Sequence, residues 1–340
     1  MEGSPVSPVG YADGDARLGR TLSVDWSAAS DLARRATGPG RLVAASDHWV
    51  FWREVDWQWG VTLAGRALAN AGIGAADRVA VRPLNPHQDA AMLEGAVAIG
   101  AQAALDDGGL PENWATALVA EPFALLGRPP SRSVRRVLLR AGPATSPAVV
   151  GRLAELAPQD ILFVQAWGPP EFPGPLALQC SEGQLHVTED ELTAEWMTDA
   201  DGAHLCVSRE GMPGMADAVL DDLVLPGTCP CGLGGLAFAA VLDRGAAVRV
   251  EGRRLARHDL IDACFRTPGF SGSARIEVRY DRGRGRNYLL VHTAPRTEGE
   301  GRETADALAY SLALATGLPV RVEWRHEEGP AGVRLQDARG

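Results

Sequence analysis

The stretch WQWGVTLAGRALANAGIGAADRVAVR, residues 57–82, decides the fold class of this chain. Apolar side chains recur at helical spacing from Trp57 to Ala71, and Gly72 follows as a possible helix C-cap, so the pattern predicts an amphipathic helix. Residues Arg78 to Arg82 then alternate in the manner of a short strand. A helix that leads through a short turn into a strand is the repeating unit of alternating α/β proteins.

The pattern of predicted elements changes near Pro169. Before it, we predict helices at 90–104 and 148–156 and buried strands at 118–119, 137–139 and 161–164, which favours a parallel, doubly wound arrangement. After it, short strands are predicted at 176–179, 184–187, 195–197 and 203–207. From about residue 246 the predicted order is strand 248–250, helix 259–265, strands 274–280 and 288–292, helix 304–315 and strand 320–324, a unit of roughly 95 residues.

These elements predict an α/β protein with three segments. Residues 1–40 are weakly patterned, residues 41–244 form a large domain whose part 169–244 is β-rich, and residues 245–340 form a small α/β sandwich domain. No apolar stretch of about 18 residues is present, so we expect no membrane span. The start of the chain, Met1 to Asp15, lacks the pattern of a signal peptide, and we expect a cytoplasmic protein.

The chain contains 33 cationic side chains and no lysine, so all of them are arginine. Its net charge of −10 argues against general nucleic-acid binding. A drift towards Ala, Gly and Arg, typical of a GC-rich genome, explains the replacement of exposed lysines. A catalytic lysine would normally be retained, because an ammonium is a compact point charge whereas a guanidinium is a rigid planar fork.

The order of several segments resembles that of the phenylacetate-CoA ligases, members of the adenylate-forming (ANL) superfamily. The segments are RLVAAS (Arg41 to Ser46), GIGAADRVAV and AIGAQAAL within Trp59 to Leu105, ALVAEPFALL (Ala117 to Leu126), AWGPPEFPGP (Ala166 to Pro175), LALQCSEGQLHVTED (Leu176 to Asp190) and TCPCG (Thr228 to Gly232). The resemblance covers about residues 40–337 and implies a reduced ANL large domain. It implies an ancestry in which ATP and Mg²⁺ activate an aromatic carboxylate before transfer to CoA.

Two sequence features of that chemistry are altered here. The family's Ser-Ser-Gly-Thr-Thr-Gly-Lys phosphate loop corresponds to Ala45–Trp52, which has no glycine or lysine but has one acid and two indoles. Glycines let backbone N–H groups approach phosphates, so this replacement disfavours a triphosphate. The family's catalytic lysine falls at Ala331, and its hinge acid falls near Gly245 or Ala246.

Two further features survive in part. The family's Mg²⁺-binding glutamate corresponds to Glu171 in the stretch WGPPE. The ribose-binding aspartate corresponds to Asp221 or Asp222, without the neighbouring Arg and Gly. Loss of one preorganised charge donor costs about 10²–10³ in rate. We therefore expect neither ATP nor Mg²⁺ as a cofactor and no useful adenylation.

Four residues have the composition of a zinc site. Cys180 and His186 are separated by five residues, and Cys229 and Cys231 follow with a single residue between them. Three thiolates and one imidazole form the closed Cys₃His shell of structural zinc, and the family resembled here carries the same set. The alternative is that these are small buried residues. Cys206 and Cys264 are predicted to be core residues.

His87 is the candidate general base, with Glu171 as its acidic counterpart and Asp89 as a residue that orients it. It follows a strand and precedes a helix, close to the acyl pocket of the family; the alternative is an exposed histidine beside a helix N-cap. The tryptophans between Trp49 and Trp59 form either a ligand wall, a plug in the nucleotide cleft, or a satellite core, which we favour. Arg282, Arg284 and Arg286 occupy a predicted hairpin tip, either as a solvated turn or as contacts to a CoA or carrier-protein phosphate.

Three functional hypotheses remain. The first is a remodelled protein that binds an aromatic or acyl ligand, such as a CoA thioester, and acts without ATP in a natural-product pathway. The second is a non-catalytic partner or scaffold of an intact ligase or of another biosynthetic enzyme. The chain would then form a heterodimer with an intact ligase, and a homodimer is the other association considered. The third is a weak AMP-forming ligase. We do not expect a nucleic-acid or membrane partner.

Overall fold

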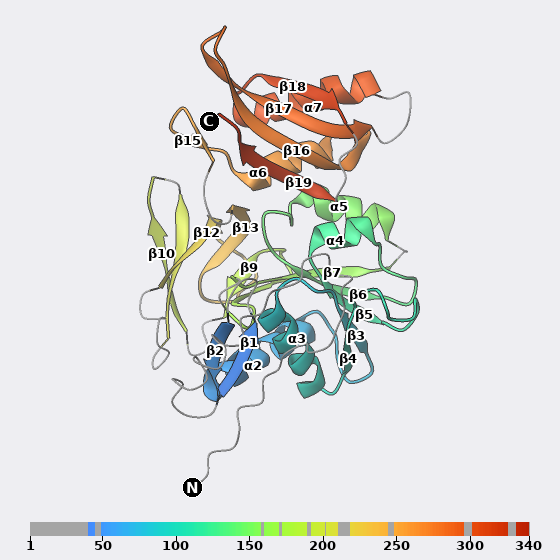
Figure 1. Cartoon of the computed structure of the whole chain (residues 1–340). Helices are drawn as coiled ribbons and strands as arrows, with labels where there is room; N and C mark the ends of the chain where they lie inside the picture. The colour runs from blue at the N-terminus through green and yellow to red at the C-terminus, as the bar shows by residue number, and fades with distance from the viewer. Residues whose placement is uncertain are drawn as a thin grey trace. The chain divides into compact units, whose positions relative to one another are not determined.

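The computed structural model describes residues 40–44, 49–157, 160–169, 172–188, 192–200, 202–209, 218–243, 248–295, 301–325 and 331–339. It has a mixed α/β fold, as predicted, with both parallel and antiparallel strands (Figure 1). Contacts divide the chain into two units. The first comprises residues 1–120, 133–138 and 168–176, and the second comprises 121–132, 139–167 and 177–340. The predicted domain boundaries at 40 and 244 lie beside residues outside the described part and stay predictions.

The first unit contains a hairpin, two helices and a set of parallel strands. Its elements are β1 (Gly40–Ala44), β2 (Trp49–Arg53), α2 (Glu54–Asn70), β3 (Arg78–Val81), α3 (Pro86–Ala98), β4 (Gln102–Leu105) and β5 (Ala117–Ala120). Strand β3 lies between β4 and β5 and is parallel to both. The alternation of helix and parallel strand is the arrangement that residues 57–82 predicted.

Helix α2 begins and ends where local chemistry places its termini. Asp56 in the first turn accepts hydrogen bonds from Arg53, with Nε to Oδ2 at 2.6 Å. Gly72 follows the helix with a φ of 73°, a left-handed conformation that glycine adopts without strain. The N–H of Ile73 donates to the carbonyl of Leu68, which closes the last turn. The predicted cap at Gly72 is therefore confirmed.

The predicted helix at 90–104 is wrong at both ends. Helix α3 begins at Pro86, a residue suited to the first helical turn, and ends at Ala98. Gly100 has a φ of 85°, which ends the helix, and β4 follows at once. The apolar run at 101–105 is thus a strand, because it pairs with β3.

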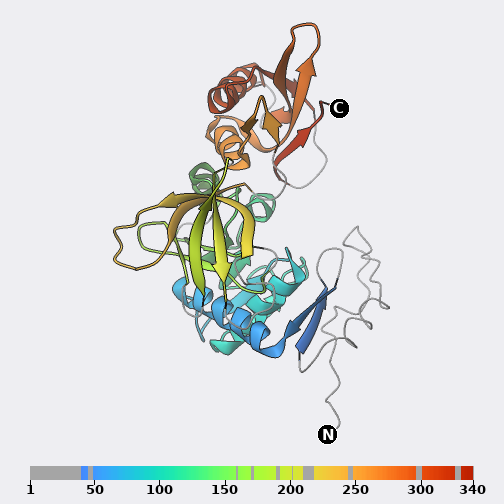
Figure 2. The same ribbon diagram turned by 90° about the vertical axis from the view of Figure 1, so that its left-hand side faces the viewer.

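The second unit begins with short helices and continues as an antiparallel sheet. Its first elements are α4 (Pro122–Gly127), α5 (Pro147–Leu156) and β7 (Leu162–Trp167); β6 (Arg136–Arg140) has residues in both units. The strands that follow are β8 (Ala177–Gln179), β9 (Leu185–Val187), β10 (Thr193–Thr198), β11 (Ala203–Ser208), β12 (Ala218–Gly227) and β13 (Ala237–Asp243). They pair in the order β10-β11-β12-β13-β9-β8-β7, and the longer ones are seen in yellow tones in Figure 2. The β-rich part was predicted, but β12 and β13 were not.

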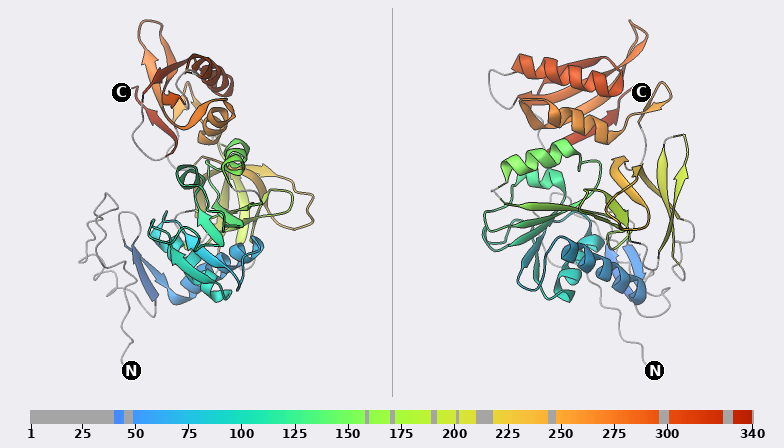
Figure 3. Two further views of the ribbon diagram at one scale, coloured as in Figure 1. Left: turned by 90° about the vertical axis from the view of Figure 1, so that its right-hand side faces the viewer. Right: turned by 180° about the vertical axis from the view of Figure 1, so that it is seen from behind.

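The C-terminal part of this unit is a four-stranded sheet with two helices on one face. The elements are β14 (Arg249–Val250), β15 (Arg253–Arg254), α6 (Arg257–Arg266), β16 (Phe270–Asp281), β17 (Arg286–Pro295), α7 (Gly301–Thr316), β18 (Val320–Trp324) and β19 (Gly332–Asp337). The sheet order is β18-β17-β16-β19, with β16 and β17 antiparallel and both edge strands parallel to their neighbours. Helices α6 and α7 lie side by side on one face (Figure 3, right).

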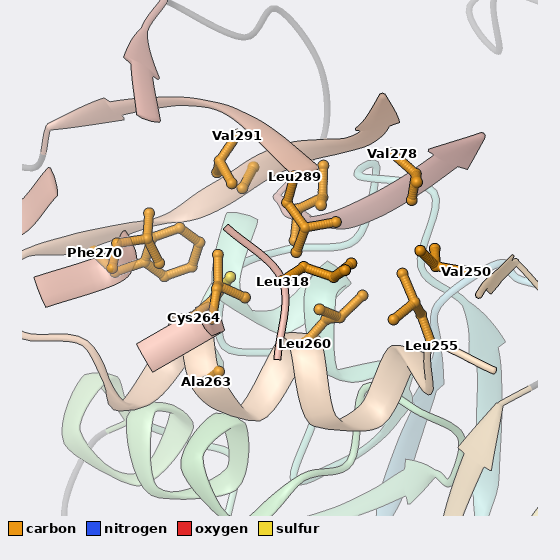
Figure 4. Packing of buried hydrophobic residues seen from close by; sticks show 14 residues of the cluster. Val250, Leu255, Leu260, Ala263, Cys264, Phe270, Val278, Leu289, Val291 and Leu318 are labelled. Atoms are coloured by element: carbon orange, nitrogen blue, oxygen red, sulfur yellow. The ribbon is translucent and has the colours of Figure 1, made fainter. Parts of the chain in front are cut away.

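A single apolar cluster fills the space between this sheet and its helices. Val278, Leu289 and Val291 point from the strands towards Leu260 and Cys264 of α6, and all are at most 1% exposed (Figure 4). Alternate residues of each strand therefore face the helices, and the intervening residues face the opposite side of the sheet. Burial raises the pKa of the Cys264 thiol far above its ordinary value, which suits the predicted core role. Cys206 in β11 is also buried, as predicted.

Candidate functional site

Three thiols and one imidazole converge at one end of β9 in the second unit. Cys180 directly follows β8, His186 lies within β9, and Cys229 and Cys231 lie in the turn between β12 and β13. Their ligand atoms all lie within 4.8 Å of one another. The structure thus brings together the four residues that the sequence proposed as a metal site.

The spacing of these atoms suits a tetrahedral metal ion. The Sγ atoms of Cys180 and Cys229 are 3.5 Å apart, and the Sγ of Cys231 lies 3.3 Å from Nε2 of His186. Two thiolates that each lie about 2.3 Å from a tetrahedral zinc ion are about 3.8 Å apart. A disulfide would need about 2.05 Å, and all five cysteines are free. The residues present therefore fit a closed Cys₃His shell.

Local backbone bonds hold the ligands in this arrangement. The N–H of Cys180 donates to the carbonyl of Gln184 at 2.8 Å, and Gly183, with a φ of 81°, completes the tight turn. The side chain of Gln184 donates to the carbonyl of Thr228 at 3.1 Å, which ties this turn to the turn that carries the other two cysteines. Gln184 was not identified from the sequence, and its position two residues before His186 was the available signal.

Hydrogen bonds favour thiolate at Cys180. Burial on its own raises the pKa of this thiol, but the hydrogen bond with Cys229 and the backbone N–H groups of Glu182 and Gln184 outweigh it and lower the pKa. The N–H of Leu233 likewise donates to the sulfur of Cys231 at 3.4 Å. Such donors stabilise negative sulfur, which is the form that binds metal.

The structure describes some of the residues that correspond to the family's nucleotide site, among them Asp221 and Asp222. Residues 45–48, the core of the altered phosphate loop, connect β1 to β2 and lie outside the described residues, as does Glu171. Asp221 and Asp222 are neighbours on β12, so their side chains point to opposite faces. Asp221 is exposed, and Asp222 is 2% exposed.

Asp222 is engaged by an indole. Its Oδ2 accepts a hydrogen bond from Nε1 of Trp167 at 2.8 Å. Trp167 ends β7, is fully buried, and meets the ring of Phe238 edge-on at 5.3 Å. In the resemblance, Trp167 replaces the tyrosine of the family's Tyr-Gly-Leu-Thr/Ser-Glu motif. The pairing of Trp167 with Asp222 was not foreseen, because 55 residues separate them.

His87 lies in the first turn of α3 and is 2% exposed, so the alternative of an exposed histidine is wrong. Its ring lies 6.1 Å from that of Trp52, which is itself 7% exposed. The carboxylate of Asp89 accepts the N–H of Leu84 at 3.0 Å, so it stabilises the turn that leads into α3. The pairing of His87 with Glu171 stays a prediction.

The segment after Trp167 is held against the first unit's own helices. Gln88 Nε2 donates to the carbonyls of Pro169 and Phe172 at 2.8 and 3.1 Å. A Cβ on Gly60 of α2 would lie 2.4 Å from Cγ of Pro173, so only glycine permits this approach. Neither the contacts of Gln88 nor the close approach at Gly60 was predicted from the sequence.

The tryptophans of the N-terminal segment contribute to a core. Trp52, Trp57 and Trp59 are 7%, 1% and 7% exposed, and the indole N–H of Trp57 donates to Glu94 at 3.0 Å. This burial agrees with the satellite core that the sequence analysis favoured over a ligand wall. The side chain of Trp49 lies outside the described part.

No protein-family model and no curated protein matches the sequence. Solved structures do match the fold. A 2-hydroxyisobutyryl-CoA ligase in the postadenylation state, in complex with 2-HIB-AMP, has a TM-score of 0.72 at 15% identity, over 87% of this chain and 73% of that chain. Fatty acyl-adenylate ligases from E. coli and L. pneumophila give 0.57 at 16% identity over 86% and 66%.

The amide bond synthetase McbA from Marinactinospora thermotolerans gives a TM-score of 0.57 at 15% identity, over 81% of this chain and 63% of that chain. Identities this low show the fold and not the reaction. Within the described residues, no helix is both long and apolar enough to cross a membrane. The chain therefore has the fold seen in these adenylate-forming (ANL) ligases.

Proposed function

We propose that this chain binds an aromatic or acyl ligand, such as a CoA thioester, and does not activate carboxylates with ATP. The observation that carries the loss of adenylation is the contact between Trp167 and Asp222. A carboxylate that binds the hydroxyls of a ribose has to reach the nucleotide. Asp222 is 2% exposed and already accepts an indole N–H at 2.8 Å, so it supports no such role. The exposed Asp221 is then the one of the two candidate aspartates that is open to a nucleotide, and it lacks the neighbouring Arg and Gly of the family's motif.

The absence of lysine supports the same conclusion. An acyl-adenylate forms through a transition state in which negative charge moves between phosphate oxygens, and a mobile ammonium suits that charge. The chain has no lysine, and Ala331 occupies the corresponding position in the resemblance. Loss of one such donor costs about 10²–10³ in rate, and loss of the phosphate loop adds to the deficit without simple additivity.

The ligand class comes from the proteins that share the fold. The solved 2-hydroxyisobutyryl-CoA ligase is described with an acyl-adenylate, and in a further structure with CoA as well. An acyl group or its CoA thioester is therefore the ligand that we assign. If a reaction follows, His87 and Glu171 are the candidate proton carriers. With 2% of its surface exposed, His87 can reach a ligand only when a neighbour such as Trp52 moves.

We also propose that the Cys₃His cluster holds one structural zinc ion. Four protein ligands fill a tetrahedral shell and leave no position for a substrate or a reactive water. The ion would tie the turn at Cys180 to the turn at Cys229 and Cys231. Cys180, His186, Cys229 and Cys231 would then stabilise the β-rich part of the second unit and take no part in a reaction.

The test compares nucleotide with thioester. ATP–pyrophosphate exchange is measured with a panel of aromatic and aliphatic acids, beside an intact CoA ligase as positive control, and thermal shifts are recorded with ATP and Mg²⁺ and with acyl- and aryl-CoA. We expect exchange at the background rate. At least one thioester should raise the Tm, and ATP with Mg²⁺ should not. Exchange above background would support the weak-ligase hypothesis. A flat response to every thioester would contradict the assigned ligand class.

A further inference from the structure

Charge is distributed unevenly along the chain. Residues 1–244 contain 17 arginines and 30 acidic residues, whereas residues 245–340 contain 16 arginines and 13 acidic residues. A protein with a net charge of −10 thus carries a C-terminal part of net charge +3. Such asymmetry between the parts of a chain points to an anionic partner for the basic part.

The outer face of the C-terminal sheet gathers much of this positive charge. Arg275 and Arg279 of β16 alternate with core residues, and the register places Arg334 of β19 beside Arg275. Arg321 of β18 lies on the same face, next to Leu290 of β17. Since α6 and α7 cover the other face, these four side chains point away from the helices. We call them the arginine face.

Ion pairs hold the arginine face in a fixed arrangement. Glu277 is 6% exposed at its centre and accepts from Nε of Arg279 at 2.8 Å, and it lies 3.3 Å from Nε of Arg275. The side chains of Arg275 and Arg279 are still 37% and 43% exposed. The guanidinium of Arg321 lies 4.5 Å above the ring of Tyr288. Preorganised guanidinium groups lose less rotamer entropy when a partner binds.

The hairpin between β16 and β17 extends the same surface. Its tip carries Arg282, Arg284 and Arg286, all exposed, and it projects beyond the sheet (Figure 3). Oδ1 of Asp281 accepts the N–H groups of Gly283 and Arg284 at 3.0 and 3.2 Å, so the turn itself is ordered by hydrogen bonds. Arg321 also reaches Asp281 at 3.2 Å, which links the tip to the arginine face.

We propose that the arginine face and the hairpin tip form a docking surface for an acidic protein. Guanidinium groups bind carboxylates in a planar, two-pronged geometry, and arginine is enriched at protein interfaces. The acids Glu277, Asp281 and Glu323 alternate with the arginines, a mixed pattern that suits the mixed charges of a protein partner. A nucleic-acid surface would instead need uniform positive charge, and here three carboxylates interrupt the arginines.

Binding of labelled poly-L-glutamate, followed by fluorescence anisotropy at 50 and 200 mM NaCl, tests this proposal. Repulsion by the net charge of −10 predicts no binding, whereas the docking surface predicts binding that weakens at least fivefold at the higher salt. The variant R282E/R284E/R286E should bind at least tenfold more weakly. The control R66E/R132E/R135E makes the same charge change at exposed sites elsewhere and should bind within twofold of the wild type.

Three results would overturn the proposal. They are no binding of poly-L-glutamate at 50 mM NaCl, an equal loss in the control variant, and tighter binding of oligouridine RNA than of poly-L-glutamate. Circular dichroism of each variant verifies that it folds, and R321Q provides a second, milder variant, which should weaken binding threefold or more. The outcome is independent of the proposed ligand, because neither ATP nor a thioester enters the measurement.

Discussion

At the scale of single residues, one buried hydrogen bond supports the proposed loss of ATP-dependent adenylation. In the stretch WGPPE the indole of Trp167 stands where the resemblance implies a phenol, and its N–H reaches Asp222. A buried carboxylate needs such donors, because a charge that is removed from water without partners is costly. The aspartate is thereby kept as a part of the core. From the sequence alone, Asp222 was one of two candidates, with Asp221, for a ligand of the ribose.

Removal of one residue of the proposed zinc site should abolish metal binding and loosen the second unit. We expect His186→Ala to lower bound zinc from about one ion per chain to near zero and to lower the Tm, since metal binding contributes directly to folding free energy. Inductively coupled plasma mass spectrometry gives the zinc content, and a thermal scan gives the Tm. Cys206→Ala removes a buried thiol outside the cluster and should keep its zinc. Full zinc content in His186→Ala would show that the cluster is not the site.

At the level of elements, glycine decides how closely α2 approaches the segment that follows Trp167. Gly60→Ala should destabilise the protein by about 1–3 kcal/mol, because its Cβ would lie 2.4 Å from Cγ of Pro173 and that turn cannot yield easily. Urea unfolding, followed by tryptophan fluorescence, measures the change.

The matched control for Gly60→Ala is Gly151→Ala in α5. An added Cβ at Gly151 would meet nothing within 4 Å, and alanine favours a helix by about 0.5–1 kcal/mol over glycine. We therefore expect this second change to be neutral or stabilising. Two equal destabilisations would mean that backbone propensity, and not the contact with Pro173, governs the effect.

Elements with strong local signals were predicted well from the sequence. Strand β18 was predicted at its observed bounds, and the centre of α2 and its Gly72 cap were also correct. The misses share a cause. Strands β12, β13 and β19 owe their existence to partners far away in the chain, and a short window of sequence contains no sign of them.

The candidate site divides in the same way. The Cys₃His set was recognisable because metal chemistry restricts both residue type and spacing, and the structure places its members together. Burial of His87 and the engagement of Asp222 by Trp167 depend on tertiary contacts, so neither could be read from residue type. The resemblance indicated which positions to consider, but it did not predict which side chains bury or contact these residues.

At the scale of the whole molecule, the ion pairs around Glu277 in the C-terminal sheet make the stability of the folded protein depend on pH. Burial on its own raises the pKa of the Glu277 carboxyl, but the hydrogen bond and charge of Arg279, with the charges of His292 and Arg275, lower it below its ordinary value. A lowered pKa stabilises the folded state fully above the unfolded-state value of about 4.3, and this stabilisation is lost as the pH falls through the folded-state pKa.

Glu277→Gln should therefore cost stability at pH 7, by about 1–3 kcal/mol, and cost progressively less below pH 4. Thermal unfolding of the wild type and the variant between pH 3 and pH 7 measures this difference. Glu323→Gln is the matched control. Its carboxylate also lies near His292, at 3.6 Å, but it is 46% exposed, so solvent screens it and we expect a smaller change. A difference between the wild type and Glu277→Gln that does not vary with pH would contradict the assignment.

Strand β19 pairs with the edge of β16 in the C-terminal sheet, which would otherwise be exposed. It runs parallel to β16 from Ser273 to Val278, and it satisfies backbone amides and carbonyls that would otherwise be open to a passing strand. A chain shortened before Gly332 would expose those groups, and the edge strands of two molecules could then pair and aggregate. Fusion partners and affinity tags joined at this end should therefore follow a generous spacer, so that the last strand remains in place.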